Sequence, residues 1–395
     1  MLLPMKTPHR WFLTAPLLLL CSYLATASDT GDADDNDTSF TSGMAAQVRL
    51  HDGNTMPVLG LGVALTAEAT YSAVQSSLEV GYRLIDTAAE ESYGNEDAVG
   101  QAIRDYIHKE ETTTITRDNV FVTTKLWDSD HGFYETLEAF DESYDTLDLG
   151  TMDLYLMHSP FGGRLIETWD AMLYAQSQGH VKSIGVSNFG IPHLQAILDS
   201  GRPLPVVNQI EMHPLVFRRR APLIEWCQRH NVQIQAYGSL MHGYPEWLTT
   251  PQLLVDLARK YDSSEQQQVT TAQILLRWAL QHDFLIIPKS SKRKRIVENA
   301  QLYNFFLSEE DMKLLDDWGD NVTPQQGNLY KMDWNWNPVD EASVHLGRTD
   351  YWPHYEGVVW EDHEYDHEEP EEGDDVYEES DEDEIDGDAA THNEL

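Results

Sequence analysis

The sequence predicts an α/β fold of the TIM-barrel class, a (β/α)8 barrel. An N-terminal β-hairpin is expected before the barrel and a C-terminal extension after it. Short runs of aliphatic and β-branched residues alternate with segments long enough to form helices. Eight such runs occur, each followed by a crossover, which is the count of a (β/α)8 barrel. Residues 47–318 also match the usual length of this fold, roughly 250 residues.

The elements are expected in the following order. Residues 48–56 predict the hairpin, because Asp52 and Gly53 form a turn dipeptide between two short strand-like runs. After the second strand of the barrel, residues 95–103 predict a helix from their apolar spacing, and the polar residues 89–92 before it predict a turn. The eight strands of the barrel are expected at 58–63, 82–88, 120–126, 152–159, 183–189, 206–213, 233–240 and 284–291.

Both ends of the chain carry patterns typical of targeting signals. Residues 1–27 predict a signal peptide, with Lys6 and Arg10 in the basic region and Ala-Thr-Ala as the cleavage site. Its apolar run, residues 11–24, is shorter than the ~20 residues of a spanning helix, so we expect no membrane span in the mature chain. An uncleaved anchor is the alternative. Residues 392–395, His-Asn-Glu-Leu, are close to an endoplasmic reticulum retention address. Together the two signals predict a protein of the endoplasmic reticulum lumen, with a retention receptor as a partner.

The segments around the barrel differ from it in composition. Residues 28–46 are small, polar and acidic, and predict a flexible linker. Residues 319–360 are rich in Trp and Tyr, and predict an aromatic extension packed on the barrel rather than a disordered segment. Residues 361–391 contain no Lys or Arg and predict a disordered acidic tail, in a chain of net charge −41. This charge argues against nucleic acid as a partner, because the phosphate backbone would be repelled.

Modification and metal binding can also be judged from the sequence. Cys227 is the only cysteine outside the signal peptide, so we expect no internal disulfide. Asn36 and Asn321 match the N-glycosylation pattern, and Asn36 is favoured because Pro324 follows the second site; we therefore expect a glycoprotein. The carboxylates of the acidic tail could bind Ca²⁺ weakly, which makes a lumenal calcium-buffering protein one alternative function. We predict no specific metal site.

Polar side chains stand at the expected carboxyl ends of the strands, where a barrel places its working residues. Each one alone has an ordinary explanation, such as a packed Tyr or a hydrogen-bonded core His. Together they form a polar set at one mouth of the barrel, which indicates a site. They are Asp86, Lys125, His158, Ser187, Asn188, Gln209, Tyr237, Lys289 and Ser290.

Residues 289–295 have a charge pattern of their own. Five of these seven residues are Lys or Arg, and they lie where the last strand leads into a helix. The N-terminus of that helix adds backbone donors, so the segment predicts an anion site. A solvated basic face or a nuclear-type basic patch is the alternative, and the signal peptide argues against the nuclear version.

Two motifs, Asp-Thr-Ala at residues 86–88 and Tyr-Gly-Asn-Glu at residues 93–96, resemble those of the aldo-keto reductase family. The stretches TTKLW, DLYLMHSP, VKSIGVSNF, VNQIEMHP, QAYGSL and IPKSSKRKRIVEN resemble it too, in the family's order, so the likeness covers residue 48 to about residue 318. The gap between Asp86 and Tyr93 is two residues longer than is usual, and the added residues fall in the 89–92 turn. The family's fold is the same (β/α)8 barrel.

The resemblance implies a catalytic tetrad of Asp86, Tyr93, Lys125 and His158. Tyr93 would be the general acid, and Lys125, paired with Asp86, would lower the pKa of the phenol. His158 would orient the substrate carbonyl. Hydride would come from NADPH, whose chemistry the protein positions.

The resemblance also assigns the pocket and the cofactor contacts. Trp127 would form the substrate pocket with His158. This pocket is less aromatic than usual, because Ala64 and Ser159 replace residues that are often Trp. Gly238 stands where a Ser often contacts the pyrophosphate. The cofactor contacts would be Ser187, Asn188, Gln209 and Tyr237 at the nicotinamide, Ser239 and Leu240 on the following loop, Lys289, Ser290 and Arg295 at the 2′-phosphate, and Glu298 and Asn299 at the adenine.

The expected function is that of a monomeric, NADPH-dependent aldo-keto reductase, an oxidoreductase of the alcohol:NADP⁺ type. It would reduce the carbonyl of a small aldehyde or ketone to an alcohol. An alternative is a non-catalytic, NADPH-binding regulatory subunit on the same barrel, because a fold does not fix a function.

Overall fold

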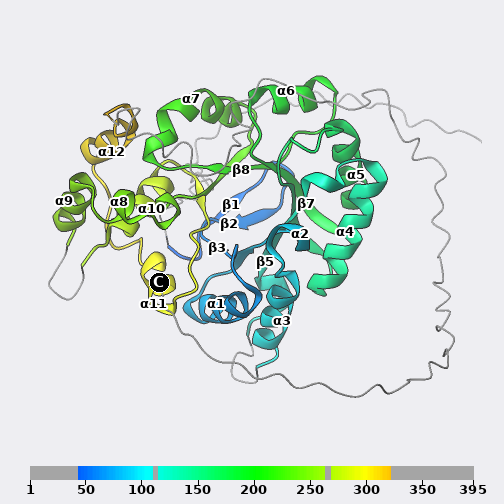
Figure 1. Ribbon diagram of the computed structural model, residues 1–395, viewed down its shortest axis with the longest axis horizontal. Coiled ribbons are helices and arrows are strands. Elements are labelled where there is room, and N and C mark those ends of the chain that lie inside the picture. Colours follow the sequence, from blue (N-terminus) through cyan, green and yellow to red (C-terminus); the bar gives the residue numbers. More distant parts are fainter. Residues whose placement is uncertain (1–42, 110–113, 263–267, 322–395) are drawn as a thin grey trace, which may run out of the picture. The chain divides into compact units, whose positions relative to one another are not determined.

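The computed structural model of the protein describes residues 43–109, 114–262 and 268–321 (Figure 1). The predicted signal peptide, acidic tail and retention tetrapeptide lie outside these ranges, as do Asn36 and most of the linker and of the aromatic extension. Of the predicted linker, residues 43–46 form a turn in which Ala46 is buried. None of the helices in the described ranges is both long and apolar enough to span a bilayer.

Eight parallel strands form the barrel, and each pairs with its neighbours in chain order (Figure 1). All six residues of β5 (Phe121–Leu126) and all six of β6 (Met152–Met157) are buried, as expected for strands between a filled interior and a layer of helices. The strands are β3 (Leu61–Gly62), β4 (Leu84–Asp86), β5 (Phe121–Leu126), β6 (Met152–Met157), β7 (Val181–Ser187), β8 (Val207–Glu211), β9 (Gln233–Tyr237) and β10 (Leu285–Ile286).

A seam between the first and last strands closes the barrel. The Ile286 amide donates to Val58 O at 2.9 Å, and the Gly60 amide donates to Ile286 O at 2.8 Å. Gly62 and Lys289 form a second parallel bridge further along. A Cβ atom on Gly62 would lie 2.9 Å from Ile287 O, so the close approach at this seam requires glycine.

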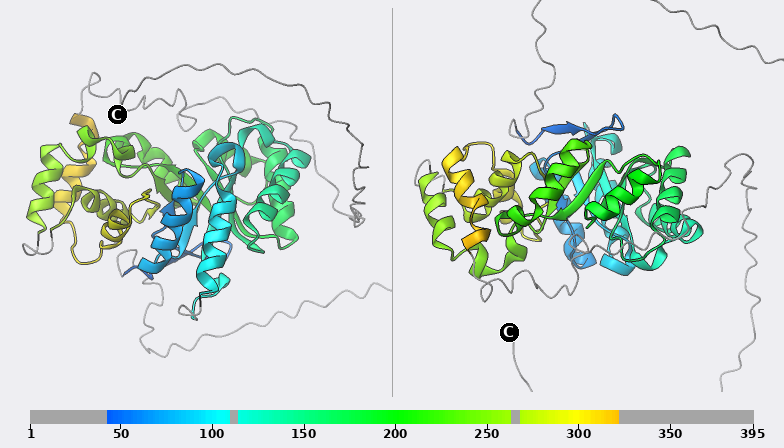
Figure 2. Two further views of the ribbon diagram at one scale, coloured as in Figure 1. Left: turned by 60° about the horizontal axis from the view of Figure 1, so that its bottom comes forward. Right: turned by 90° about the horizontal axis from the view of Figure 1, so that it is seen from above.

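The predicted hairpin is present and lies across the amino-terminal end of the barrel (Figure 2). Its strands are β1 (Gln47–Arg49) and β2 (Thr55–Pro57), which pair antiparallel, and Gly53 takes a φ of 94° in the turn. The turn is fixed to the start of β7, because Ser183 Oγ donates to Asp52 Oδ2 at 2.6 Å. The opposite end of the barrel, where the strands finish, remains open to the loops that carry the candidate site.

A helix follows each of the eight barrel strands and lies on the outside of the barrel (Figures 1 and 2). One helix after each strand forms the outer ring, and the crossover after β9 carries two extra helices before its ring helix. The ring helices are α1 (Ala67–Val80), α3 (Glu96–Ile107), α4 (Phe133–Leu147), α5 (Leu165–Ser177), α6 (Ile191–Asp199), α7 (Pro214–Arg229), α10 (Thr271–Gln281) and α11 (Arg293–Ala300); the others are α2 (Glu90–Tyr93), α8 (Pro245–Leu248), α9 (Gln252–Lys260) and α12 (Glu309–Asp316).

The predicted order of elements is confirmed, but several boundaries were wrong. Seven of the eight strands are shorter than predicted: β3 begins only at Leu61, and β10 ends at Ile286, where the chain leaves the sheet for the loop that carries Lys289. The exception, β7, keeps its predicted length but begins two residues earlier, at Val181. The helix expected at 95–103 runs from Glu96 to Ile107. Residues 89–92 do not form a simple turn: Glu90–Tyr93 wind into one helical turn, α2, which ends at Gly94 in the left-handed region with φ 61°.

Candidate active site

Lys125 and Asp86 form a buried charge pair at the carboxyl ends of β5 and β4. The Lys125 ammonium donates to Asp86 Oδ1 at 2.7 Å and to Thr87 O at 2.6 Å, and its side chain has no exposed surface. Burial alone would lower the pKa of Lys125, but the Asp86 carboxylate holds it above its ordinary value. Burial raises the pKa of Asp86, and the contacts with Lys125 and Gln209 oppose that rise. Asp86 therefore keeps the Lys125 ammonium protonated and fixed in position at the carboxyl end of the barrel.

Tyr93 lies beside this charge, although its turn is longer than expected. Lys125 Nζ is 5.3 Å from the centroid of the Tyr93 ring, and the ring meets His158 edge-on at 5.9 Å between centroids. Burial raises the pKa of Tyr93 above its ordinary value, and the positive charge of Lys125 lowers it by less. The predicted lowering by Lys125 is thus outweighed by burial, and the phenol carries its proton at neutral pH.

His158 follows β6 and completes the cluster. Its ring lies edge-on to Trp127, with 5.1 Å between centroids, and it is buried. Burial and, to a lesser extent, the charge of Lys125 together lower the pKa of His158 to about 3, so the imidazole is neutral. Within the described residues, His158 Nδ1 has no hydrogen-bond partner. A neutral imidazole has one N–H that can donate to a carbonyl oxygen.

A hydrogen-bond network joins this cluster to four side chains predicted for the nicotinamide. Asn188 has a left-handed backbone with φ 61°; its Nδ2 donates to His158 O at 2.9 Å, and its Oδ1 accepts from the Tyr237 hydroxyl at 2.8 Å. Ser187 Oγ donates to Gln209 O at 2.8 Å. The barrel therefore brings the predicted catalytic and nicotinamide residues into one connected group.

Gln209 has a role inside the protein that the sequence did not predict. Its amide nitrogen donates to Asp86 Oδ2 and to Gln235 Oε1, both at 2.7 Å. Both N–H groups are used, so only Oε1 remains for a ligand. Gln209 thus supports the buried carboxylate of Asp86, and its predicted contact with a carboxamide would be as an acceptor.

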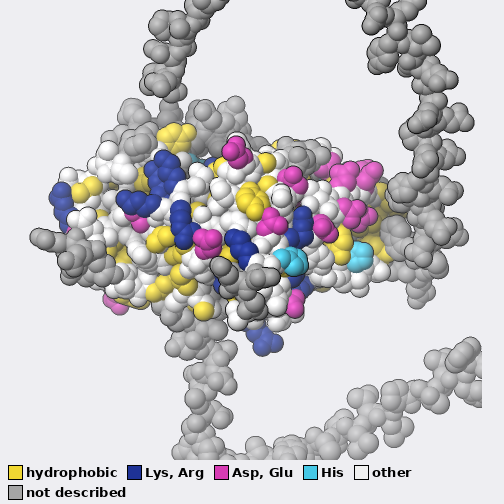
Figure 3. All heavy atoms as spheres, turned by 90° about the horizontal axis from the view of Figure 1, so that it is seen from below, with side chains coloured by type: hydrophobic (Ala, Val, Ile, Leu, Met, Phe, Trp, Pro, Cys, Tyr) yellow, Lys and Arg dark blue, Asp and Glu magenta, His cyan; other side chains and the backbone are white. Residues whose placement is uncertain are grey.

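The basic run lies after β10 and along α11, on the face of the molecule shown in Figure 3. Arg293 pairs with Glu79, and Lys294 lies 3.7 Å from Glu298. Among the described residues, Lys289, Lys292 and Arg295 make no ion pair with a carboxylate, and all three are exposed. These three cations are therefore the part of the run that is free to meet an anion.

The remaining predicted contacts lie close to these elements. Ser290 and Asn299 are buried, Glu298 is half-buried, and the Ser290 hydroxyl accepts from the Lys292 amide at 3.1 Å. Ser239 and Leu240 follow β9, on the same end of the barrel as Tyr237.

The aldo/keto reductase family model matches residues 58–320. The chain belongs to this family. It is 39% identical over 272 residues to the glyoxal reductase of Bacillus subtilis, a match that covers 68% of this chain and 91% of that protein. It is 40% identical over 268 residues to a methylglyoxal reductase of Escherichia coli, which covers 67% of this chain and 90% of that protein. A crystal structure of a Bombyx mori aldo-keto reductase in complex with NADP aligns with a TM-score of 0.61 and 32% identity, and covers 70% of this chain and 94% of that one.

One cluster in this aldo-keto reductase was missed at the sequence level. Glu211 Oε1 accepts from His213 Nε2 and from His242 Nε2, both at 3.0 Å. Burial would raise the pKa of Glu211, but these two hydrogen bonds hold it far below its ordinary value. The contact joins the end of β8 to the loop that carries Ser239 and Leu240. Glu211 and His213 stand two apart at a strand end, which was a usable signal, whereas nothing in the sequence marked His242.

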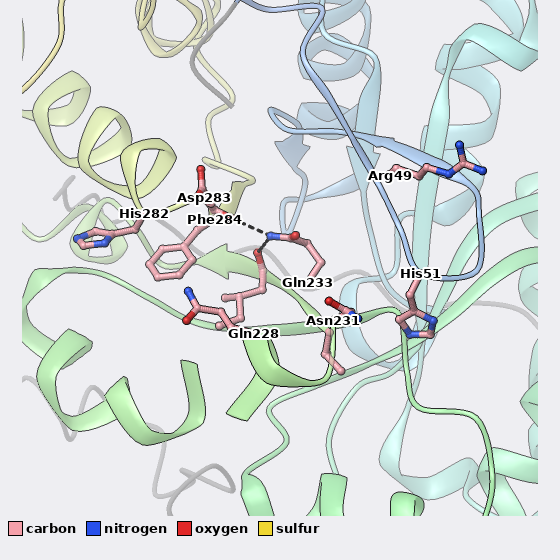
Figure 4. Close-up of a pocket in the computed structure, with 10 residues that line it drawn as sticks. Arg49, His51, Gln228, Asn231, Gln233, His282, Asp283 and Phe284 are labelled. Carbon is pink, nitrogen blue, oxygen red and sulfur yellow. Dashed lines mark hydrogen bonds between the residues drawn. The ribbon is translucent and has the colours of Figure 1, made fainter. Parts of the chain in front are cut away.

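The candidate active site of this aldo-keto reductase does not coincide with the hollow in Figure 4. That hollow, about 540 Å³, lies at the amino-terminal end of the barrel and is lined by side chains such as His51, Gln233 and His282. Gln233 Nε2 donates to Asp283 O at 2.8 Å within it, so part of its lining is already hydrogen-bonded. Among the described residues, no group of His, Cys, Asp and Glu is arranged to hold a metal ion.

Proposed function

We propose that this aldo-keto reductase uses NADPH to reduce the carbonyl of a small aldehyde or ketone to an alcohol, with Tyr93 as the general acid. The observation that carries the proposal is the convergence of Asp86, Tyr93, Lys125 and His158 at one mouth of the barrel, in spite of the longer turn before Tyr93. Such a cluster of ionisable groups with perturbed pKa values is typical of a catalytic site.

Each member of the cluster has a distinct task in this proposal. The neutral His158 donates a hydrogen bond to the substrate carbonyl and orients it. Tyr93 transfers its proton to the carbonyl oxygen while the carbon accepts a hydride, so the product is an alcohol. The Lys125 ammonium stabilises the phenolate that Tyr93 becomes, and Asp86 keeps Lys125 charged inside the barrel. NADPH supplies the hydride when it is bound.

The residues present fit a phosphorylated dinucleotide. Gln209 keeps one acceptor oxygen for an amide, the Tyr237 ring lies beside Asn188, and Lys289 and Arg295 keep exposed cationic groups. Charge-assisted hydrogen bonds from these two cations would stabilise a bound 2′-phosphate, which NADPH has and NADH lacks. The preference for NADPH over NADH is part of the proposal.

Steady-state turnover with a panel of aldehydes and ketones tests the activity. The names of the two bacterial relatives support glyoxal and methylglyoxal as the first members of the panel. Loss of NADPH absorbance that depends on the carbonyl compound is the expected result. Tight NADPH binding without turnover on any member would contradict the proposal, and would favour the regulatory-subunit alternative.

We also propose that the protein acts in the lumen of the endoplasmic reticulum. The support is the pairing of the N-terminal signal pattern with the C-terminal residues 392–395. Deleting those four residues should release the protein into the medium, as followed by immunoblotting of cells and medium. If the protein that lacks residues 392–395 stayed entirely inside the cells, the prediction that these residues retain it would be contradicted.

A further inference from the structure

One hydrogen bond closes the loop that carries Tyr93. The Thr87 hydroxyl donates to Asn95 Oδ1 at 2.6 Å, and both residues have no exposed surface. Thr87 lies directly after β4, and Asn95 lies directly before α3, so the bond joins the two ends of the segment between them. Tyr93 lies inside this closed loop, two residues before Asn95.

Both ends of the loop are fixed to the surrounding structure. The side-chain nitrogen of Asn95, Nδ2, donates to Val63 O at 2.6 Å and lies 3.1 Å from Leu65 O. Thr87 is held on its other side by its backbone: its amide donates to Thr123 O at 2.8 Å, and its carbonyl accepts from the Lys125 ammonium at 2.6 Å. The Thr87–Asn95 bond therefore connects the loop after β3 to the charge beside the phenol.

Inside the loop, the added residues are absorbed by local structure. The Ala89 amide donates to Lys125 O at 3.1 Å, and Ala89 O accepts from the Ser92 and Tyr93 amides at 2.9 and 3.0 Å. Gly94 then reverses the chain in the left-handed region. With both ends fixed, one helical turn can take up the two extra residues without moving the Tyr93 ring away from Lys125 and His158.

We propose that Thr87 and Asn95 are positioning residues, whose hydrogen bond holds the Tyr93 phenol in register with Lys125 and His158. This inference rests on the proposed function. A displacement of about 1 Å at a reacting group can cost ~10²-fold in rate. Loss of the Thr87 hydroxyl therefore affects turnover far more than it affects cofactor binding.

The test compares three variants with the full-length protein. Thr87→Val keeps the shape of the side chain and removes the donor, and kcat should fall at least ~10-fold while the Kd for NADPH changes less than ~2-fold. Thr87→Ser restores the hydroxyl and should restore most of the activity. Thr123→Val is the matched control, because Thr123 is a buried β5 residue whose hydroxyl has no hydrogen-bond partner among the described residues, and its kcat should be unchanged.

A second readout separates positioning from general damage. Thermal unfolding is measured for each variant, and Thr87→Ala replaces Thr87→Val if the latter does not fold. In a Tyr93→Phe background, the residual single-turnover rate should be insensitive to Thr87→Val, because the phenol that the bond positions is absent.

Three outcomes would overturn the inference: wild-type kcat in Thr87→Val, equal losses in Thr87→Val and Thr123→Val, or an equal loss in the Tyr93→Phe background. Failure of the proposed function looks different. In that case the wild-type protein turns over no carbonyl compound, or Tyr93→Phe keeps wild-type turnover.

Discussion

Lys125 Nζ lies 2.7 Å from Asp86 Oδ1, and neither side chain has appreciable contact with solvent. A buried ion pair is stable only when both partners are present, because removing one leaves an uncompensated charge in a poorly solvated site. The other Asp86 oxygen accepts from Gln209, so the carboxylate is held from two sides. Both the stability of the barrel and the charge available to Tyr93 therefore depend on this one contact.

Lys125→Met should be inactive and also less stable. The buried Asp86 would lose its cation, which costs about 3–5 kcal/mol in the free energy of unfolding, and Tyr93 would lose the charge that stabilises its phenolate. Lys182→Met is the control, because Lys182 is exposed and its partner Asp153 keeps Arg117 at 2.8 Å. Denaturant unfolding and turnover should both separate the two variants. A Lys125→Met protein as stable as Lys182→Met would contradict the view of a buried, mutually dependent pair.

Tyr93→Phe should lose carbonyl reduction and keep NADPH binding. The variant retains the ring that packs against His158 and removes only the hydroxyl, and a positioned acid is typically worth ~10²–10⁴-fold in rate. Because the pKa of Tyr93 lies above its ordinary value, wild-type reduction should show no loss from phenol ionisation below about pH 9. Stopped-flow turnover and fluorescence titration with NADPH measure the two effects. Unchanged turnover would mean that another group supplies the proton.

Arg295→Met should weaken NADPH binding and leave NADH binding nearly unchanged. Losing a charge-assisted bond to the 2′-phosphate costs about 1.5–3 kcal/mol, which is roughly a 10- to 150-fold rise in Kd. Arg293→Met is the matched control on the same helix, since Arg293 is already paired with Glu79. Calorimetry with both nucleotides decides the matter. Equal losses of affinity for NADPH and NADH would contradict the proposed contact between Arg295 and the 2′-phosphate.

His158→Gln should reduce the sensitivity of the fold to acid. The pKa of His158 is about 3 in the folded protein and about 6.5 in an unfolded chain, so the unfolded state binds the proton first as pH falls. Stability is therefore lost below about pH 6.5, and this residue alone accounts for roughly 2 kcal/mol between pH 8 and pH 5. Urea unfolding at both pH values should show a smaller difference in the variant. The exposed His108→Gln serves as the control, and the same pH difference in both variants would argue against a neutral, buried His158.

Asp128 should select against substrates that carry a carboxylate. It follows Trp127, and its Oδ1 accepts from Ser159, the neighbour of His158, at 2.7 Å. Asp128→Asn should raise kcat/KM for succinic semialdehyde relative to butanal, because a like charge at the pocket would be removed. Burial raises the pKa of Asp128, so the wild-type discrimination should grow as pH rises through that pKa. The exposed Asp145→Asn is the control, and an unchanged ratio in Asp128→Asn would exclude this role.

The sequence was informative where the fold imposes a repeating pattern. The alternation of strands and helices, and the polar residues Asp86, Lys125 and His158 at strand ends, follow from periodicity that any reader of the chain can see. The hairpin was equally clear, because Gly53 stands where the turn needs a positive φ. These features are determined by residues close together in the sequence, so they could be predicted from the sequence pattern alone.

Features that depend on distant residues were not reached. The short helix α2 replaces an expected turn, because its backbone is set by Lys125 O and by the Thr87–Asn95 bond rather than by its own polar sequence. The dual use of Gln209 requires Asp86 and Gln235 to come together on separate strands. The contact of His242 with Glu211 depends on a loop conformation that no pattern in the chain signals.

The seam between Val58 and Ile286 would make the proposed preference for NADPH a late event in folding. It joins segments more than two hundred residues apart, and such distant pairings form slowly because a long loop must close first. Lys289 lies on this seam, and its ammonium donates to Ala64 O at 3.3 Å from the far side of it. A partly folded chain with an open seam would lack a complete phosphate site, so affinity for NADPH over NADH would appear only when the last strand docks. During refolding, the appearance of a preference for NADPH over NADH would therefore report that the barrel is complete.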